Sequence, residues 1–484
     1  MKKQLSLLLA GCMLGITACG GTSPANSDTT APSTDTGTTV AETSGTDLFS
    51  ADYENYNFRI LTANAESNTW FTSTLTVMED EGDVFSSAVY KRNQLAEEAL
   101  NITITEEYQE IQSIRAGIMA GDDTADLLLI HGSNVLAMAQ EGALHDLLTL
   151  PHQDFEAKWW DTNAAEQLSI AGSLYFGVGD FITTANDETI VTFFNKQLLG
   201  DLKLEDPYQL VADGEWTLDK MMEMGKAAMR ENGDTVYNDQ DTYGLLGHQN
   251  MLYIYLICGS GETIITKDKD DIPAFTFNNE RFTEAYLKVL NVIHGNGEGF
   301  LYDANVKQNT MGLSNNHRVQ EIMFPNNQSL FWVETVSWAN DLRDMDADFG
   351  ILPCPKHDKT QDEYSNLNNG SFYGMSVPIT VSDIDRTSYI LEALNAFSTD
   401  TVQSAYYEIS LKGKITRDEE SSAMLDLIFG NRTFDCSVTY SIARMRHGIC
   451  AKALENDTNI ASYYASQQSA IESQLNDIVE AFQK

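Results

Sequence analysis

The body of the chain alternates between two hydrophobic patterns that predict strands and helices in turn. Residues 57–63 read as a first strand, and residues 101–106 alternate apolar and polar side chains as a second. Residues 86–100 and 111–120 place apolar side chains at helical spacing. Residues 126–131 form a continuous apolar run, which is typical of a strand buried on both faces. This order predicts a doubly wound α/β lobe.

The loops of such a lobe are the first place to look for a ligand. Ligands of open α/β sheets bind at the carboxyl ends of the strands. The loops expected there are 64–70 and 132–134, and Ser133 can cap a further helix over 135–141.

A second block of the same kind begins at residue 189. Residues 189–194 read as a strand, and residues 215–229 as a helix with Thr217 at its N-cap. About 435 residues follow residue 47, which is too many for one core and implies two lobes. The later segments continue the alternation at 252–258, 280–293 and 329–336, with strands expected at 348–353 and 373–378 and helices at 385–397 and 462–482.

The first residues have the layout of an export signal. Lys2 and Lys3 precede an apolar stretch over 5–16 that is too short to span a bilayer, which needs about 20 residues. The stretch ends in Ile-Thr-Ala-Cys-Gly, which resembles a bacterial lipobox with its cysteine at Cys19. Cleavage after residue 18 would leave Cys19 as a lipidated N-terminus. An ordinary signal peptide with an incidental cysteine is the alternative, and Cys12 is a rival site that leaves a shorter apolar stretch.

Residues 19–47 are predicted to be the lipidated cysteine and a disordered tether. The segment is rich in Thr, Ser, Gly, Ala and Pro and lacks aromatic residues, Lys and Arg. Such a composition cannot bury enough apolar surface to offset its ordering entropy. A flexible chain of this length reaches roughly 30 Å, so it would act as a leash between a membrane and the body.

Charge and cysteine content narrow the partners. The formal net charge of −41 makes nucleic acid and anionic lipid poor partners and suits a protein that stays monomeric. Cys436 and Cys450 are the nearest cysteine pair in the body, so an exported protein could join them by a disulfide. Buried free thiols are the preferred expectation for these and for Cys258 and Cys354.

Short motifs distributed over residues 53–484 resemble the family 1 extracellular solute-binding proteins, the receptors of ABC importers, in the lipoprotein form found in Gram-positive bacteria. Each motif is weak alone, whereas their order and spacing together are specific. They lie at 56–61, 85–93, 120–126, 159–161, 194–196, 210–218, 348–353, 377–378 and 417–421.

The resemblance implies a periplasmic-binding-protein-like fold: two doubly wound α/β lobes joined by a hinge of two or three crossing segments, with the ligand between the lobes. The crossings should fall near 181–189, 371–377 and 413–417. The expected organisation is a signal peptide at 1–18, the tether at 19–47, the first lobe at 48–185 and 373–412, and the second lobe at 190–370 and 415–484.

Many members of this family bind sugars, which need flat aromatic faces beside planar polar groups. Trp70 and Asn68 are candidates in the loop after the first strand. Glu334 and Trp338 lie in a stretch that resembles the one carrying stacking tryptophans in maltose-binding members, although Val and Ser occupy much of it here. A surface or hinge-packing tryptophan is the alternative for Trp70, and ordinary packing inside a lobe is the alternative for Glu334 and Trp338.

Two further pairs are implied by the resemblance. Asn250 and Tyr253 correspond to another ligand loop of the family, and Asn369 and Tyr373 lie at the second crossing. The remaining tryptophans are expected to pack in the core: Trp159, Trp160 and Trp216.

One acidic loop resembles an EF-hand that has lost its metal. Asn232, Asp234, Asn238 and Asp241 stand at positions 3, 5, 9 and 12 of the calcium-loop pattern. Position 1 is occupied by a cation, Arg230, and the turn glycine at position 6 is replaced by threonine. No metal and no cofactor are therefore expected.

The preferred interpretation is a lipid-anchored extracellular receptor that delivers a small solute, a mono- or oligosaccharide, to the permease subunits of an ABC importer. Two alternatives stay open: a ligand-sensing partner of a membrane kinase and an exported glycan-active enzyme. The enzyme is disfavoured because the sequence contains no HExxH, G-x-S-x-G or P-loop motif.

Overall fold

The computed structural model describes residues 48–63, 82–303, 309–313, 316–342, 345–407 and 419–483, with the backbone alone at 249–250 and 316–317. These residues belong to a single compact unit that begins at Ser44. Cys19, the tether, Asn68 and Trp70 lie outside the described residues, as does the expected crossing at 413–417. None of the described helices is long and apolar enough to cross a membrane.

The first sheet has the strand order β12-β3-β1-β2. Strand β1 (Tyr56–Ala63) pairs in parallel with β2 (Ile102–Gln109) and with β3 (Leu127–His131). The late strand β12 (Tyr373–Ser376) joins the edge of the sheet antiparallel to β3. The first four residues of β3 are buried, as its continuous apolar run predicts. The chain therefore returns to its first sheet after building the second.

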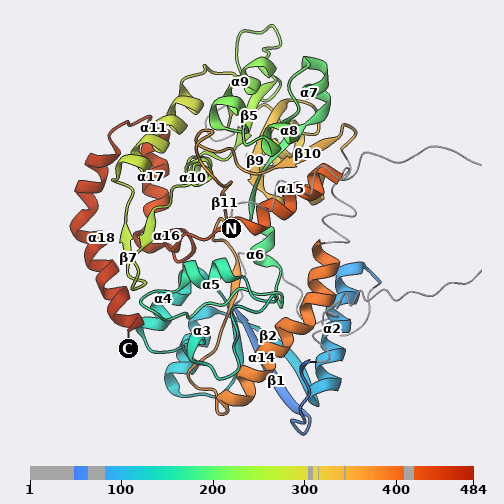
Figure 1. The fold of residues 1–484 in the computed structure, drawn as a ribbon, viewed down its shortest axis with the longest axis vertical. Coiled ribbons are helices and arrows are strands. Elements are labelled where there is room, and N and C mark those ends of the chain that lie inside the picture. Colours follow the sequence, from blue (N-terminus) through green and yellow to red (C-terminus); the bar gives the residue numbers. More distant parts are fainter. Residues whose placement is uncertain are drawn as a thin grey trace, which may run out of the picture. The chain divides into compact units, whose positions relative to one another are not determined.

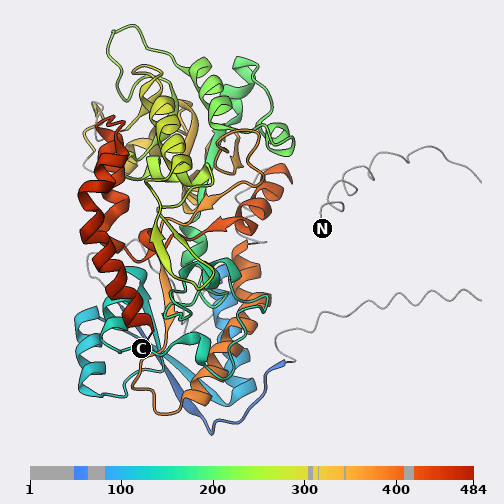
Figure 2. The same cartoon turned by 60° about the vertical axis from the view of Figure 1, so that its left-hand side comes forward.

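Helices cover both faces of this sheet (Figures 1 and 2). Helices α2 (Val84–Leu100) and α14 (Ile384–Ser398) lie side by side on one face, and α3 (Ile111–Ala120) and α4 (Gly132–Gln140) lie on the other. Helix α2 ends at Asn101, which adopts a left-handed conformation with φ of 48°. The predicted strand–helix order is thus reproduced in three dimensions.

The expected cap of α4 is wrong. The helix begins at Gly132, and its N-cap is His131, whose Nδ1 accepts a hydrogen bond from the backbone N–H of Ser133 (3.1 Å). The helix also packs tightly at its first residue. A Cβ on Gly132 would lie 2.6 Å from the carbonyl oxygen of Thr439, so only glycine fits there.

The second sheet has the order β10-β4-β9-β5-β8 and is mixed rather than wholly parallel. Strand β4 (Ile190–Asn195) runs antiparallel to β9 (Ser329–Thr335) and to β10 (Phe349–Leu352). Strand β5 (Tyr243–Gly247) is parallel to β9 and to β8 (Leu301–Tyr302). The carboxyl ends of β5 and β9 therefore meet at one edge.

Helix α9 (Leu218–Ala228) begins as its sequence predicts. The hydroxyl of Thr217 accepts from the backbone N–H of Lys220 (3.3 Å), which confirms the N-cap. The other helices of this block are α7 (Lys196–Leu202), α8 (Pro207–Ala212), α10 (Gln249–Gly259), α11 (Glu280–His294), α12 (Asn316–Met323), η3 (Val336–Trp338), α13 (Ala339–Leu342) and α15 (Glu419–Gly430).

Two segments cross between the sheets and bond to each other. The first contains the short helix α6 (Thr184–Asp187) and leads into β4. The second leads back from β10 towards β12. An antiparallel bridge joins Thr189 to Asn368, and the Asn368 side-chain amide donates to the carbonyl of Ala185 (2.6 Å). These bonds hold the two crossings side by side.

Buried free thiols are confirmed at Cys258, Cys354, Cys436 and Cys450.

The remaining elements are short or lie near the C-terminus. The elements are η2 (Leu147–Thr149), α5 (Thr162–Leu168), the strand pairs β6 (Ile265–Lys267) with β7 (Pro273–Phe275) and β11 (Asn366–Leu367) with β13 (Arg432–Thr433), the π-helical turn η4 (Thr399–Gln403), α16 (Cys436–Thr439), η6 (Ile442–Arg444), α17 (Met445–Leu454) and α18 (Ile460–Phe482).

Candidate functional site

A cavity of about 290 Å³ lies where both crossing segments meet the carboxyl ends of β5 and β9. This is the edge at which open α/β sheets bind their ligands. Its walls come from the residue after α6, the start of α10, the β9–η3 junction and the second crossing. The lining residues are Glu188, His248, Met251, Tyr255, Glu334, Thr335, Ser337, Trp338, Asn369 and Ser371.

The crossing segments fix one wall. The backbone N–H of Asn369 donates to the carbonyl of Glu188 (3.0 Å), so these two residues stand opposite each other. The Asn369 side-chain oxygen accepts from the backbone N–H of Ser371 (2.7 Å). Gly370 between them has φ of 79°, and a Cβ there would lie 2.9 Å from the carbonyl of Val438. Glycine is therefore required for this turn.

The end of β9 supplies the opposite wall. Glu334 is 4% exposed, and one of its carboxyl oxygens accepts from the backbone N–H of Thr335 (3.0 Å). Trp338, in η3, packs against Trp332 of β9 with ring centroids 5.7 Å apart. The backbone N–H of Val336 donates to the carbonyl of Thr189 (2.8 Å), which ties this wall to the first crossing.

The carboxyl groups of this cavity hold their protons more strongly than usual. Burial, together with the negative charges of Asp187 and Glu334, raises the pKa of Glu188 to about 8, although Asn369 and Arg446 oppose the shift. Burial raises the pKa of Glu334 to about 7, against a hydrogen bond from Thr335 that lowers it. Both carboxyl groups therefore titrate near neutral pH rather than near pH 4.5.

The other titratable side chains of the cavity are neutral at that pH. Burial lowers the pKa of His248 below its usual value, which favours the uncharged imidazole. Burial raises the pKa of Tyr255 well above its usual value, so its phenol keeps its proton. The walls therefore present aromatic faces and hydrogen-bonding groups without a lysine or arginine among the lining residues.

The cavity brings together three of the residues singled out from the sequence: Glu334, Trp338 and Asn369. Two others lie elsewhere. Tyr253 is fully buried in α10, and its hydroxyl bonds with Nε2 of His294 (2.9 Å). Tyr373 is buried in β12, where its carbonyl accepts from the Thr184 hydroxyl (3.0 Å).

Asn250 lies in α10, in the part described by backbone alone. Seven lining residues were not singled out from the sequence: Thr335, Ser337 and Ser371, which lie within two residues of predicted ones, and four others. Three of those four, His248, Met251 and Tyr255, share one face of the α10 region at spacings of three and four. The fourth, Glu188, comes just before β4 inside the expected first crossing.

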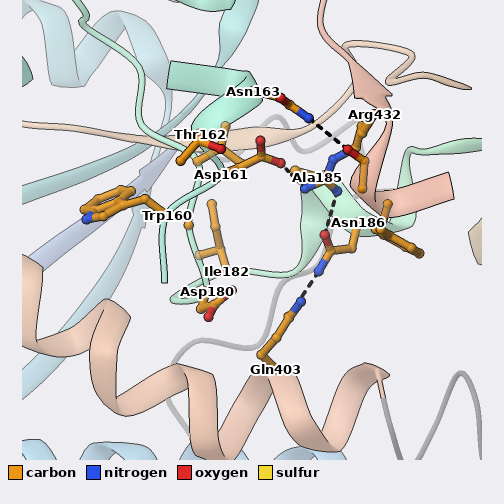
Figure 3. Close-up of a pocket in the computed structure, with 14 residues that line it drawn as sticks. Trp160, Asp161, Thr162, Asn163, Asp180, Ile182, Ala185, Asn186, Gln403 and Arg432 are labelled. Carbon is orange, nitrogen blue, oxygen red and sulfur yellow. Dashed lines mark hydrogen bonds and ion pairs between the residues drawn. The ribbon is translucent and has the colours of Figure 1, made fainter. Parts of the chain in front are cut away.

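A second pocket, of about 250 Å³, lies beside α6 and contains a chain of polar contacts (Figure 3). Arg432 forms an ion pair with Asp161, the N-cap of α5. The Arg432 guanidinium also donates to the Asn186 side-chain oxygen (2.6 Å), and the Asn186 amide donates to the side-chain oxygen of Gln403 (3.1 Å). These polar groups bond to one another across four segments, which gives the pocket a structural role.

Trp160 also borders this pocket. Its indole N–H donates to one carboxyl oxygen of Glu392 in α14 (2.9 Å), and Trp159 donates to the other (2.7 Å). Trp216 is fully buried and donates to the carbonyl of Pro353 (2.9 Å). All three tryptophans have core contacts, as expected from the sequence.

The acidic loop over 232–241 uses its side chains on its own backbone. The two carboxyl oxygens of Asp241 accept from the backbone N–H groups of Asn232 (2.9 Å) and Asn238 (2.7 Å), and Asp234 accepts from Val236 (2.9 Å). These are turn-forming bonds. Among the described residues, no group of three or more His, Cys, Asp or Glu side chains could hold a metal ion.

The two α/β sheets and the paired crossings have the fold of the solute-binding proteins of ABC importers. No family model and no curated protein matches the chain. Solved structures do match most of the chain. Because their sequence identities are low, they show a shared fold and nothing more.

The similar structures include the GacH receptor of Streptomyces glaucescens (13% identity, TM-score 0.54, 87% of this chain and 99% of that chain). A family 1 extracellular solute-binding protein from Bifidobacterium longum subsp. infantis is similar at 15% identity and a TM-score of 0.52, over 88% and 98% of the two chains. The ABC substrate-binding protein Lmo0181 from Listeria monocytogenes is similar at 14% and 0.50, over 88% and 99%. The fold implied by the sequence motifs is thereby confirmed.

Proposed function

We propose that this chain is a receptor that captures a small solute, a mono- or oligosaccharide, and presents it to an ABC-type importer. The observation that carries the proposal is the cavity bounded by both crossing segments at the carboxyl ends of β5 and β9. Two of the similar proteins were solved with bound ligands: GacH in complex with acarbose and Lmo0181 in complex with cycloalternan. The proposed role is capture and delivery, with no chemistry on the solute.

The lining suits a sugar. A sugar ring has an apolar C–H face and a rim of hydroxyls, so it pairs with aromatic rings and with planar polar groups. Trp338 and Tyr255 supply the rings, and the carboxyl and amide groups of Glu334, Glu188 and Asn369 supply the rim. The volume is near the lower end of the range of about 300–1,000 Å³ usual for small-molecule sites.

The crossings supply the motion that a receptor needs. A solute that contacts both sides of a hinge stabilises the closed arrangement by its differential contacts. Glu188 and Asn369 are on the crossings themselves, whereas Trp338 belongs to the second-sheet block. A bound solute would therefore link the crossings to that block, and the permease would recognise the closed form.

We further propose that the receptor is held at the outer face of the cell membrane by lipid on Cys19. The motif that ends at Cys19 and the polar segment after it support this anchoring. Two acyl signals give stable attachment, whereas one chain binds only marginally. Cys19→Ala should release the chain into the medium without changing its affinity for solute, which fractionation of expressing cells and calorimetry would measure. Membrane retention of Cys19→Ala would contradict the anchor.

The receptor proposal is tested by a thermal-shift screen of the purified chain. A ligand that binds only the folded state raises Tm by mass action. Mono- and oligosaccharides are expected to raise Tm, and peptides are not. The matched control is Tyr108→Ala, which removes an exposed aromatic ring of β2 far from the cavity in sequence. If a peptide raises Tm and no saccharide does, the carbohydrate assignment is wrong.

A further inference from the structure

The two sheet blocks are joined at a second place, apart from the crossing segments. One block is built on the first sheet (48–185 and 373–412) and the other on the second (190–370 and 415–484). The β6–β7 hairpin of the second block reaches the end of α5 and the loop after it, residues 166–172 of the first block. Figure 1 shows β7 on the side of α18, away from α6. We call the contact at 166–172 the seam.

Two side chains of the hairpin make most of its bonds to the seam. The Lys267 ammonium donates to the carbonyl oxygen of Glu166 and to the carbonyl and hydroxyl oxygens of Ser169 (both 2.9 Å). Asp271 pairs with Lys267 (2.5 Å), and its carboxylate and carbonyl accept from the backbone N–H groups of residues 172 and 171 (3.0 and 2.8 Å). The side chains of Lys267 and Asp271 are only 16% and 24% exposed, so these bonds are partly shielded from water.

The C-terminal segment bonds to the same stretch of the first block. The backbone N–H of Phe434 donates to the side-chain oxygen of Gln167 (2.7 Å), and the Tyr440 hydroxyl donates to the carbonyl oxygen of Leu168 (2.8 Å). A contact made by one bond could act as a pivot between two blocks. Bonds distributed over residues 166–172 instead fix the orientation of the blocks as well as their separation.

The arrangement that the seam holds is open towards the cavity at β9. In the part of the chain that the structure describes, no lining residue of this cavity comes from the first block: Glu188, Asn369 and Ser371 stand on the crossings, and the others belong to the second block. A solute held by both blocks therefore requires the first block to rotate towards it about the crossings. Because the seam joins the blocks away from the crossings, this rotation must break or displace its bonds.

We infer that the seam holds the receptor in its open arrangement and that its bonds are released when the blocks close on a solute. The inference rests on the proposed receptor function. A receptor whose closed form is less populated binds its solute with a weaker apparent affinity. Weakening the seam should therefore favour the closed form and strengthen solute binding, although no residue of the cavity changes.

The test is a double variant, Lys267→Met with Asp271→Gly. Methionine keeps the apolar part of the lysine side chain, and glycine suits the φ of 61° at residue 271. Small-angle X-ray scattering of the solute-free variant should give a smaller radius of gyration than the unmodified chain. With acarbose as the probe, calorimetry should show binding that is about threefold tighter or more. Lys267→Met alone, which keeps the Asp271 bonds to the backbone, should show the same shifts at smaller size.

The matched control is Lys269→Met in the turn of the same hairpin. Lys269 pairs with its neighbour Asp270 (2.5 Å), both side chains are exposed, and neither bonds to the seam. This variant should change neither the radius of gyration nor the affinity. If Lys267→Met and the double variant also leave the radius of gyration unchanged, or if they bind acarbose more weakly, the inference is overturned and the receptor function stands.

Hydrogen exchange of the unmodified chain tests the seam without a substitution. The backbone amides of residues 171 and 172 donate to Asp271, so they should exchange about threefold faster or more when acarbose is bound. Unchanged or slower exchange with acarbose bound would contradict release of the seam. If the variants are more compact and neither acarbose nor another saccharide binds, the saccharide part of the proposed function fails and the role of the seam stands.

Discussion

The two pockets beside the first crossing have similar volumes and opposite internal chemistry. The pocket of Figure 3 measures about 250 Å³, and its arginine, acid and amides bond to one another. The cavity at β9 measures about 290 Å³, and its acids face the cavity space without a lysine or arginine in its walls. Paired polar groups hold segments together, whereas carboxyl and amide groups that line a cavity can contact a ligand.

The comparison predicts that breaking the ion pair of Figure 3 costs the most stability. Arg432→Met leaves the carboxylate of Asp161 buried without its partner, since the two side chains are 8% and 12% exposed. The free energy of unfolding should fall by about 3–5 kcal/mol, the usual cost of leaving one charge of a buried pair uncompensated. Urea denaturation followed by circular dichroism measures it.

The double variant Asp161→Asn with Arg432→Met is the control for this pair. Replacing both partners removes the unpaired charge, so part of the lost stability should return. If Arg432→Met unfolds at the same urea concentration as the unmodified chain, the pocket does not have the structural role assigned to it.

In the β9 cavity the change in the free energy of unfolding should have the opposite sign. Replacing an ionisable carboxyl group there by a neutral amide should stabilise the chain. A folded Glu334 holds its proton up to about pH 7, whereas an unfolded glutamate releases it near pH 4.5. The folded state therefore binds more protons between these values, and its stability falls as pH rises through that window.

Glu334→Gln should remove this loss. The difference in the free energy of unfolding between Glu334→Gln and the unmodified chain should be near zero at pH 4.5. At pH 8 the variant should be more stable by on the order of 2–3 kcal/mol. Denaturation across that pH range measures the difference. Glu98→Gln, an exposed acid of α2, is the control and should show no such trend. A pH-independent difference for Glu334→Gln would show that its carboxyl is not buried as described.

A tryptophan of the β9 cavity should affect binding more than folding. Trp338→Ala removes the ring that lines the cavity and rests on Trp332. Solute affinity should fall by about tenfold or more, or roughly 1.4 kcal/mol. Calorimetry with the best saccharide of the screen measures it. Unchanged affinity would remove Trp338 from the site.

The local elements could be predicted because their signals are local. The apolar run of β3 and the Thr217 cap of α9 appear in the structure where the sequence places them. At α4 the His131 side chain takes the cap position, and Gly132 beside it packs against Thr439, about 300 positions along the chain. No local pattern carries such a contact.

The same limit applies to the two pockets. Asp161 and Arg432 are 271 positions apart, so their pairing arises only from the fold. Tyr253 was expected in place of Tyr255 because the run 252–258 is apolar all round, and a helix without a polar stripe gives no indication of which face meets a cavity. Glu334, Trp338 and Asn369 were reached through family motifs, and their contact with solute stays a prediction.

The smallest expected effect concerns the edge of the Figure 3 pocket. Gln403→Ala removes the acceptor for the Asn186 amide, a single hydrogen bond of 3.1 Å at a partly exposed side chain. Such bonds contribute about 0.5–1.5 kcal/mol to stability. The variant should therefore lose about 1 kcal/mol in urea denaturation and keep the affinity of the β9 cavity. A change in affinity larger than twofold would contradict this separation. It would show that the pocket of Figure 3, whose chain of contacts includes α6, also affects the crossings that carry Glu188 and Asn369. The two pockets would then be energetically coupled.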